Sequence, residues 1–233
     1  MIPDRAFFVD PDSVSGQSFI LNKTESNHAI RVLRMKVGNE IALLDGVGTG
    51  YNGKIQSVNK LVTGEILQTF PNLGENEYQI ILASALIKRD RFESILEKAT
   101  ELGVTEICPV LMDRSVKNKL NIERCQKLIQ SASKQTMRSK FPKFYPPKSL
   151  DDILKLEGQK ICAMIGETKQ LSKLNLKKEN PIVVIIGPEG DFSEHEIELM
   201  KKADVQFYNL GDRRLRSETA ALNSLSVLNE TLM

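Results

Sequence analysis

A short segment near the end of the chain carries charged residues in a pattern that could do chemistry. The sequence GDRRLRSETAAL places Arg213, Arg214 and Arg216 just before a predicted helix, and Glu218 falls in the first turn of that helix. A helix N-terminus already carries a partial positive charge, so cations beside it are unfavourable for folding. Such violations of a local rule are expected where function overrides stability. The alternative is an exposed basic edge without function, whose charge Glu218 partly offsets.

Three apolar strands predicted in the second half of the chain end in a similar glycine corner. The runs AMIGET, VIIGPEG and YNLGDRR reach these corners at Gly166, Gly187 and Gly211. Ligands of open parallel sheets bind beyond the carboxyl ends of the strands, and glycine lets a ligand approach the main chain closely. Pro188 fixes one turn residue and removes a donor. One corner alone is more simply a strand–helix connection, whereas three together predict a preformed slot that reads a base or a ribose.

Composition and motifs exclude several other kinds of site. The chain has neither GxGxxG nor GxxxxGK[ST], so a Rossmann pyrophosphate site and a P-loop are not supported. Two histidines without CxxC or HxxxH predict no protein-bound metal. Three widely spaced cysteines indicate reduced thiols in a cytoplasmic protein. We expect no membrane span, because no apolar run reaches about 18 residues, and the N-terminus does not resemble a signal peptide.

The hydrophobic pattern predicts two domains. Residues 1–72 contain short strands with glycine turns and one helix, SNHAIRVLRM, which Ser26 could cap; this spacing favours a small β-barrel. Residues 73–233 alternate apolar strands with helices, which implies an α/β domain with a mostly parallel sheet. Ser149 and Ser193 each begin a capping-box pattern at a predicted helix start.

A basic segment, Ser131–Lys148, suggests contact with nucleic acid. It contains five basic residues and no acidic residue, and Phe141, Phe144 and Tyr145 are interleaved with them. Lysine and arginine supply phosphate contacts, and exposed aromatic rings can stack on bases. The alternative is a solvated face whose aromatic residues belong to the core.

Cations in both domains are candidates for phosphate contacts. The predicted set is Arg5, Arg31, Arg34, Lys88, Arg138 and Lys140. Arg31 and Arg34 are three residues apart, so the predicted helix would present them on one face. A salt-bridged surface helix is the alternative for either residue alone.

The glycine corners belong to longer segments, IIGPEGDFSEHEI and NLGDRRLRSETAAL, that resemble the SPOUT methyltransferases. Within that group the chain is similar to the RsmE family, which methylates uracil N3 in small-subunit ribosomal RNA. Further matches are HAIRVLRMKVGNEIALLDG, ALIKRDRFESILEKATELGV and FFVD at residues 7–10, so the resemblance spans nearly the whole chain. Two departures are visible: Asp191 stands where the family often has a second glycine, and Arg89 stands where a glycine is usual.

The resemblance implies a fold, a cofactor and partners. The fold would be a PUA-like β-barrel followed by a SPOUT-type α/β domain with a C-terminal trefoil knot. The protein would work as a homodimer on ribosomal RNA, in the assembled small subunit, with S-adenosylmethionine bound in the knotted loops. Carried over residue by residue, the cofactor contacts are Gly166, Glu167, Gly187, Pro188, Glu189, Gly190, Leu210, Gly211, Leu215, Arg216, Thr219 and Ala220.

The implied reaction assigns roles to charged residues. A sulfonium methyl group is already activated, so no metal is needed, but uracil N3 must lose a proton before it can attack. The negative charge then builds on two carbonyl oxygens, which a cationic donor stabilises. We assign this role to Arg216, because a guanidinium offers a planar fork that matches paired acceptors. Glu218 and Glu189 are the candidates to accept the proton; either could instead cap a helix or hold an arginine.

Other functions stay open at this point. A non-catalytic RNA-binding protein would bind RNA but show no cofactor-dependent thermal shift. An α/β enzyme acting on a small nucleotide would lack salt-sensitive RNA binding. A SPOUT methyltransferase acting on a different RNA nucleotide is a further alternative. The knot-loop motifs favour the uracil-N3 methyltransferase over these.

Overall fold

The computed structural model describes residues 2–115 and 120–232. Within this part the chain packs as two compact units. The first comprises the residues up to Glu75 together with Gln130–Phe141, and the second comprises Asn76–Ile129 and the residues from Pro142 onward. The pattern of strands and helices along the chain gives no sign that Gln130–Phe141 joins the first unit, and the division after residue 72 stays a prediction.

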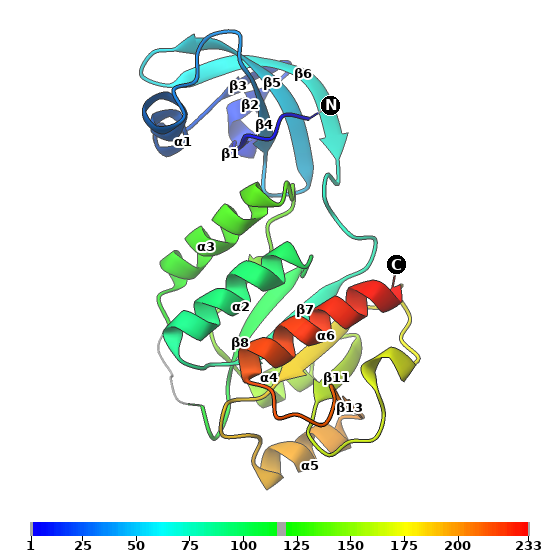
Figure 1. Ribbon diagram of the computed structural model, residues 1–233. Helices are drawn as coiled ribbons and strands as arrows, with labels where there is room; N and C mark the ends of the chain where they lie inside the picture. Colours follow the sequence, from blue (N-terminus) through cyan, green and yellow to red (C-terminus); the bar gives the residue numbers. More distant parts are fainter. Residues whose placement is uncertain (1, 116–119, 233) are drawn as a thin grey trace. The chain divides into compact units, whose positions relative to one another are not determined.

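The first unit is built on a curled sheet of six strands (Figure 1). In chain order the strands are β1 (Ala6–Phe8), β2 (Val14–Ser15), β3 (Ser18–Ile20), β4 (Glu40–Leu44), β5 (Thr49–Val58) and β6 (Val62–Pro71). They lie in the order β1-β4-β5-β6-β3-β2, and all neighbours are antiparallel except the pair of β1 with β4. A one-turn 3-10 helix, η1 (Pro11–Ser13), precedes β2. The predicted strands of this region are confirmed.

The helix of the first unit begins earlier than predicted. α1 (Lys23–Asn27) is capped by Asn22, whose side-chain oxygen accepts the backbone N–H of Glu25 at 2.9 Å. Ser26 lies inside the helix and is buried, and its hydroxyl accepts the backbone N–H of Val62 at 2.9 Å. The prediction that Ser26 caps the helix is therefore wrong. Asparagine is an equally strong N-cap residue, and the serine is used to hold a strand instead.

The predicted common helix face of Arg31 and Arg34 is also wrong. α1 continues as a single π-helical turn, η2 (His28–Val32), which contains Arg31. Arg34 lies beyond this turn with a φ of 52°, in the left-handed region. A residue in that conformation ends a right-handed helix, so the two arginines do not share a helical repeat.

The segment Gln130–Phe141 is held to the first unit by a buried ion pair. Arg138 Nη2 lies 2.7 Å from Glu75 Oε2, and the two side chains are only 3% and 9% exposed. Glu75 Oε1 also accepts the backbone N–H of Lys140 at 3.0 Å. Arg138 was a predicted phosphate contact. Its burial and its carboxylate partner correct this assignment: the guanidinium holds Glu75 rather than facing solvent.

The second unit is a parallel sheet with helices on both faces (Figure 1). Its strands are β7 (Ile80–Ala85), β8 (Glu106–Leu111), β9 (Lys143–Phe144), β10 (Lys148–Ser149), β11 (Gln159–Ala163), β12 (Ile182–Ile186) and β13 (Gln206–Tyr208). They lie in the order β10-β8-β7-β12-β11-β13, β9 also pairs with β8, and all of these described pairs are parallel. The predicted α/β class with a mostly parallel sheet is confirmed, and the trefoil knot stays a prediction.

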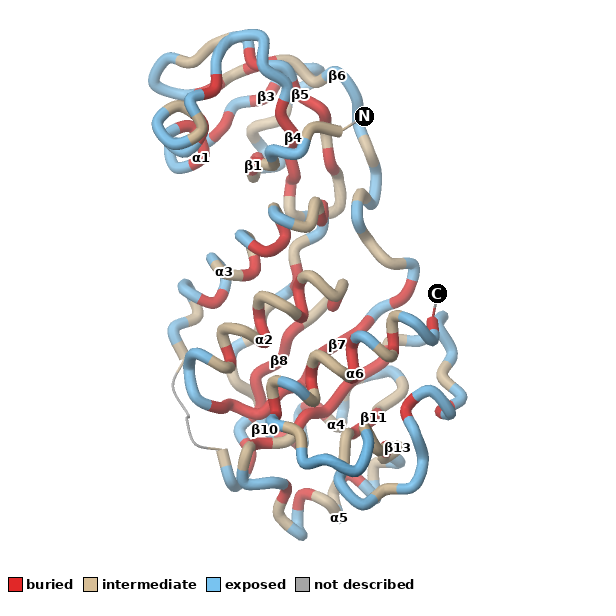
Figure 2. The backbone as a smooth tube through the Cα atoms, in the orientation of Figure 1, coloured by how far each residue is buried: buried red, intermediate tan, exposed pale blue. Residues whose placement is uncertain are grey.

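Helices cover the parallel sheet according to the alternation of its side chains. They are α2 (Arg89–Glu101), α3 (Ile122–Gln135), α4 (Leu150–Leu154), α5 (Glu194–Lys202) and α6 (Ser217–Leu232), with a 3-10 turn η3 (Leu171–Lys173). Val184 of β12 packs in the core shared with α2, α3 and α6, whereas Val183 and Ile185 pack in the core shared with α4 and α5. Figure 2 shows the buried central strands β7 and β8. The predicted capping boxes at Ser149 and Ser193 are confirmed.

Candidate active site

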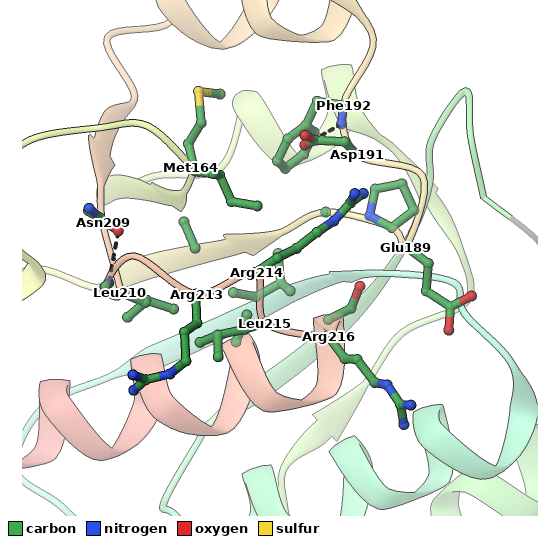
Figure 3. A pocket seen from close by; sticks show the side chains of 18 of the residues that line it. Met164, Glu189, Asp191, Phe192, Asn209, Leu210, Arg213, Arg214, Leu215 and Arg216 are labelled. Carbon is green, nitrogen blue, oxygen red and sulfur yellow. Dashed lines mark hydrogen bonds between the residues drawn. The ribbon is translucent and has the colours of Figure 1, made fainter.

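The loops that follow β11, β12 and β13 line a cavity of about 280 Å³ in the second unit (Figure 3). The three strands are adjacent in the sheet, and the loops leave their carboxyl ends. This is the edge at which open parallel sheets bind ligands. The cavity is completed by the start of α6 and by Arg91 of α2.

The cavity brings together most of the predicted cofactor contacts. Those that line it are Gly187, Pro188, Glu189, Leu210, Gly211, Leu215, Arg216 and Ala220. Four predicted contacts, Gly166, Glu167, Gly190 and Thr219, are not part of the lining. Gly166 directly follows the lining residue Ile165, and a Cβ placed on it would meet no atom within 4 Å. The first corner therefore borders the cavity through the residues that precede its glycine.

Other lining residues were not among the predicted contacts. They are Arg91, Ala163, Met164, Ile165, Ile186, Asp191, Phe192, Asn209, Arg213, Arg214 and Ser217. Most of them flank the glycine corners directly, so extending each corner by two or three residues in the sequence would have found them. Arg91 is different, because it comes from the first turn of α2 and no local pattern connects it with the corners.

The corner after β12 is fixed by close packing. A Cβ on Gly187 would lie 2.8 Å from the ring of Phe192, so only glycine lets this buried ring lie against the main chain. Asp191 has a φ of 66°, its N–H donates to the carbonyl of Pro188 at 3.1 Å, and its side chain accepts the N–H of Phe192 at 2.9 Å. Aspartate is one of the residues that tolerate this left-handed conformation. Asp191 thus adopts a backbone conformation that glycine takes up readily.

The corner after β13 is open, in contrast to the one after β12. Gly211 has a φ of 113°, and a Cβ there would meet no atom within 4 Å. Its N–H donates a hydrogen bond to the side-chain oxygen of Asn209 at 2.8 Å. Apolar side chains, among them Met164, Leu210 and Leu215, line the cavity beside these main-chain groups. An apolar slot bordered by main-chain polar groups suits a flat heterocycle with polar edges.

Three exposed arginines surround the start of α6. Arg213, Arg214 and Arg216 line the cavity, and their side chains diverge from the loop before the helix (Figure 3). Within residues 2–115 and 120–232, none of the three side chains makes a hydrogen bond or an ion pair with the protein. The carbonyl of Arg216 accepts the N–H of Ala220 at 2.8 Å, so this residue sits at the very start of the helix. Free cations beside a positive helix end favour an anionic ligand.

Both candidate proton acceptors hold an arginine. Arg91 Nη1 donates to Glu189 Oε1, and Arg91 Nε lies 3.6 Å from Glu218 Oε1. The side chains of Glu189 and Glu218 are 23% and 17% exposed. The second oxygen of Glu218, Oε2, is buried and has no hydrogen-bond partner in the described part of the chain. Glu189 lines the cavity, whereas Glu218 is not part of the lining and borders it next to Ser217. The second oxygen of Glu218 is therefore an acceptor without a partner, one residue away from the lining.

The remaining predicted phosphate contacts are at the surface. Arg5, Arg31, Arg34, Lys88 and Lys140 are all exposed, unlike Arg138. Arg5 Nη1 also donates to Met35 Sδ at 3.1 Å. Exposure makes all five accessible to phosphate, and their roles stay predictions.

The aromatic residues of the basic segment pack against other parts of the protein. This agrees with the alternative that they serve the fold rather than stack on bases. Phe141 packs on Phe8 with ring centroids 5.6 Å apart, and Phe144 packs against the core under α2 and α6. Lys143 Nζ and Lys148 Nζ lie 4.6 and 4.3 Å from the ring centroid of Tyr145. The described contacts of these rings are therefore intramolecular.

Two further features of the described residues concern metal and membrane binding. No group of three or more His, Cys, Asp or Glu side chains is placed to hold a metal ion. None of the described helices has the length and apolar character needed to cross a membrane.

The thiol of Cys162 lies next to the lining residue Ala163 in the chain. Burial raises its pKa well above the usual value, which makes it a poor nucleophile.

Comparison with known proteins places the chain in a family. A model of the RNA methyltransferase domain matches residues 74–229, and a model of the RNA methyltransferase PUA domain matches residues 21–67. Ribosomal RNA small subunit methyltransferase E from Synechocystis sp. is 30% identical, over 96% of this chain and 77% of the relative. The chain belongs to the RsmE family. The RsmE protein of Bacillus subtilis is 29% identical over 91% of this chain and 90% of its own.

Solved structures of similar proteins contain a ligand. RsmE from Neisseria gonorrhoeae, bound to S-adenosyl methionine, matches with a TM-score of 0.89 and 28% identity over 97% of each chain. A putative methyltransferase from Legionella pneumophila, in complex with the same cofactor, matches with a TM-score of 0.88 and 29% identity over 98% of each chain. The resemblance inferred from the glycine corners and the LRSETA segment is thus confirmed at the level of the RsmE family and its fold.

Proposed function

We propose that this protein transfers the methyl group of S-adenosylmethionine to N3 of a uridine in small-subunit ribosomal RNA. The observation that carries the proposal is the cavity at the ends of β11, β12 and β13, which main-chain corners, apolar side chains and arginines without a partner in the described residues line together. Membership of the RsmE family and the cofactor bound in two solved relatives support the same function. Methylation of a different RNA nucleotide is the alternative.

The residues of the cavity fit the methyl donor. Met164, Leu210 and Leu215 offer an apolar surface for an adenine ring. The exposed main chain around Gly211, whose own N–H already donates to Asn209, can contact the edge of the base or the ribose. The corner at Gly187–Glu189 would form the opposite wall. When bound, S-adenosylmethionine supplies a methyl group on a positively charged sulfur, which is already reactive toward a nitrogen anion.

The charged residues around the cavity would act on the uracil. Loss of the N3 proton leaves negative charge on the two carbonyl oxygens. The guanidinium of Arg216, which has no partner among the residues that the structure describes, is suited to stabilise it. Glu218 is favoured over Glu189 as proton acceptor, because Glu189 accepts a hydrogen bond from Arg91, whereas Glu218 Oε2 has no partner in the described part of the chain. Glu189 would then mainly hold Arg91.

The remaining parts of the proposal concern RNA and assembly. The exposed cations Arg5, Arg31, Arg34 and Lys140 of the first unit would contact phosphates, and Lys88 of the second unit would make a phosphate contact of its own. Phosphate contacts make RNA affinity fall with salt. We expect a homodimer that acts in the cytoplasm on the assembled small subunit.

One experiment tests the proposed function directly. Small subunits from a strain that lacks this protein are incubated with it and with S-adenosylmethionine carrying a labelled methyl group, and the modified base is mapped by mass spectrometry. We expect one labelled 3-methyluridine. Free ribosomal RNA tested in parallel identifies the preferred substrate. Label on another nucleotide would contradict the N3 assignment, and absence of label in both RNA forms would contradict the function.

A further inference from the structure

Arg91 lines the cavity, and the reaction described above gives it no part of its own. It occupies the first turn of α2, where two arginines, Arg89 and Arg91, stand at a helix end that disfavours cations. Arg89 is compensated one turn later by Glu93, with Nε 2.7 Å from Oε1, away from the cavity. Arg91 instead reaches out of its helix to two carboxylates that come from other elements.

The two carboxylates come from two separate segments of the chain. Glu189 belongs to the corner after β12, 98 residues from Arg91 along the chain, and Glu218 belongs to the first turn of α6. One guanidinium therefore links α2, the β12 corner and the start of α6. Its planar fork presents Nη1 to one carboxylate and Nε to the other. Lysine, a single point charge, cannot hold two carboxylates in this way.

This linkage leaves Glu218 in an unusual state. Its Oε1 faces Arg91 at 3.6 Å, while its Oε2 is buried and has no hydrogen-bond partner in the described residues. A buried acceptor without a partner lowers stability. This oxygen belongs to the residue that follows the lining residue Ser217, and this position points to a bound substrate as its partner.

We propose that Arg91 is a positioning residue for methyl transfer, which orients Glu218 so that Oε2 is free to take the proton of uracil N3. The proposal rests on the function proposed above. The N3–H bond breaks as the O–H bond to Glu218 forms, and its electron pair stays on the uracil. That pair then forms the N3–methyl bond, while the electrons of the broken carbon–sulfur bond remain on sulfur. Arg91 itself touches neither reacting atom in this scheme.

Substitution of Arg91 tests the proposal with Arg89 as matched control. Arg91→Gln should lower kcat by about 10- to 100-fold, because a misplaced proton acceptor forfeits part of what a positioned base contributes. KM for the ribosomal substrate and Kd for S-adenosylmethionine should change by no more than about threefold, since the groups that bind them remain. Arg89→Gln removes a cation from the same helical turn and should leave all three quantities unchanged. Arg91→Lys should recover part of the lost kcat.

A double variant separates positioning from a merely structural role. If Arg91 acts through Glu218, then Arg91→Gln combined with Glu218→Gln should have a kcat within about twofold of Glu218→Gln alone. Multiplicative losses would overturn the proposal, as would wild-type kcat in Arg91→Gln. Thermal melting checks folding; if Arg91→Gln does not fold, the same comparison is made with Arg91→Lys. All kcat values are measured on whichever base the wild-type protein methylates. An error in the N3 assignment would therefore show in the base that the wild type labels, whereas an error in the role of Arg91 would show in the kcat ratios between variants.

Discussion

The arginine side chain has opposite surroundings at positions 138 and 216. Arg138, in the first unit, is buried and paired with Glu75 at 2.7 Å. Arg216, in the second unit, is exposed beside the cavity and has no side-chain partner among residues 2–115 and 120–232. Both were predicted to meet a ligand, because both lie in basic stretches of sequence. The difference teaches that partners and burial, rather than local charge, separate an arginine that holds the fold from one that is free to act.

Arg138→Ala should give the largest effect on this comparison. The substitution leaves Glu75 buried without a counter-charge, so the free energy of unfolding should fall by about 3–5 kcal/mol. Urea denaturation measures the change, and Arg31→Ala, which removes an exposed arginine from the same unit, is the control with an expected change within about 0.5 kcal/mol. A loss as small as that of the control would show that the buried pair does not hold the segment.

Arg216→Ala should show the opposite behaviour. We expect kcat for methylation to fall by about 10²- to 10³-fold, as when one donor to a developing oxyanion is removed. The unfolding free energy should change by no more than about 0.5 kcal/mol, and S-adenosylmethionine should still bind in calorimetric titrations. Arg216→Lys keeps the charge without the planar fork and should recover only part of the rate. Full activity in Arg216→Ala would remove it from the mechanism.

Gly187→Ala extends the comparison from charge to packing at the cavity. The new Cβ would lie 2.8 Å from the Phe192 ring, and overpacking of this kind costs about 1–3 kcal/mol. The displaced ring should also weaken S-adenosylmethionine binding, measured by titration calorimetry. Combining Gly187→Ala with Phe192→Leu makes room for the methyl group and should restore part of the affinity. Unchanged affinity in the single variant would show that this corner does not shape the binding site.

Substitution of Glu93, which pairs with Arg89 and Arg124 in a partly exposed ion cluster, should have the smallest effect on stability. Hydrogen bonds from Arg124 and then Arg89 lower the pKa of its carboxyl from 4.5 to about 2. A depressed folded-state pKa stabilises the protein above the unfolded value, and this contribution is lost as the pH falls from 4.5 toward 2. Because the cluster is accessible to solvent, Glu93→Gln should cost no more than about 1 kcal/mol at pH 7. Unfolding curves of both proteins at several pH values should converge toward pH 2, and a constant difference would contradict the assignment.

Much of the fold could be predicted because its signals are local. Apolar runs and helical spacing located the strands and helices of the parallel sheet, and the capping boxes at Ser149 and Ser193 are contained within four residues of sequence. The glycine corners predicted most of one cavity, since parallel strands bring their carboxyl ends to one edge.

The common face predicted for Arg31 and Arg34 failed for a local reason, the left-handed φ of Arg34. The other errors and omissions discussed next involve partners that are distant in sequence. Ser26 was taken as a cap, but its hydroxyl accepts the N–H of Val62, 36 residues away. Arg138 was taken as a surface cation, but it pairs with Glu75, 63 residues away. Arg91 was missed, because Glu189 is 98 residues away. Spacing patterns describe neighbours within one element, so they cannot show which charge will meet which carboxylate across the folded unit.

The central claim is that three strand-end corners hold the methyl donor beside Arg216. A crystal structure of the protein grown with saturating S-adenosylmethionine tests it most directly. The account predicts density for the donor between the corners after β12 and β13, with its adenine against the main chain near Gly211 and its methyl group open toward Arg216. Density at any other place, or none under saturating conditions, would contradict the account.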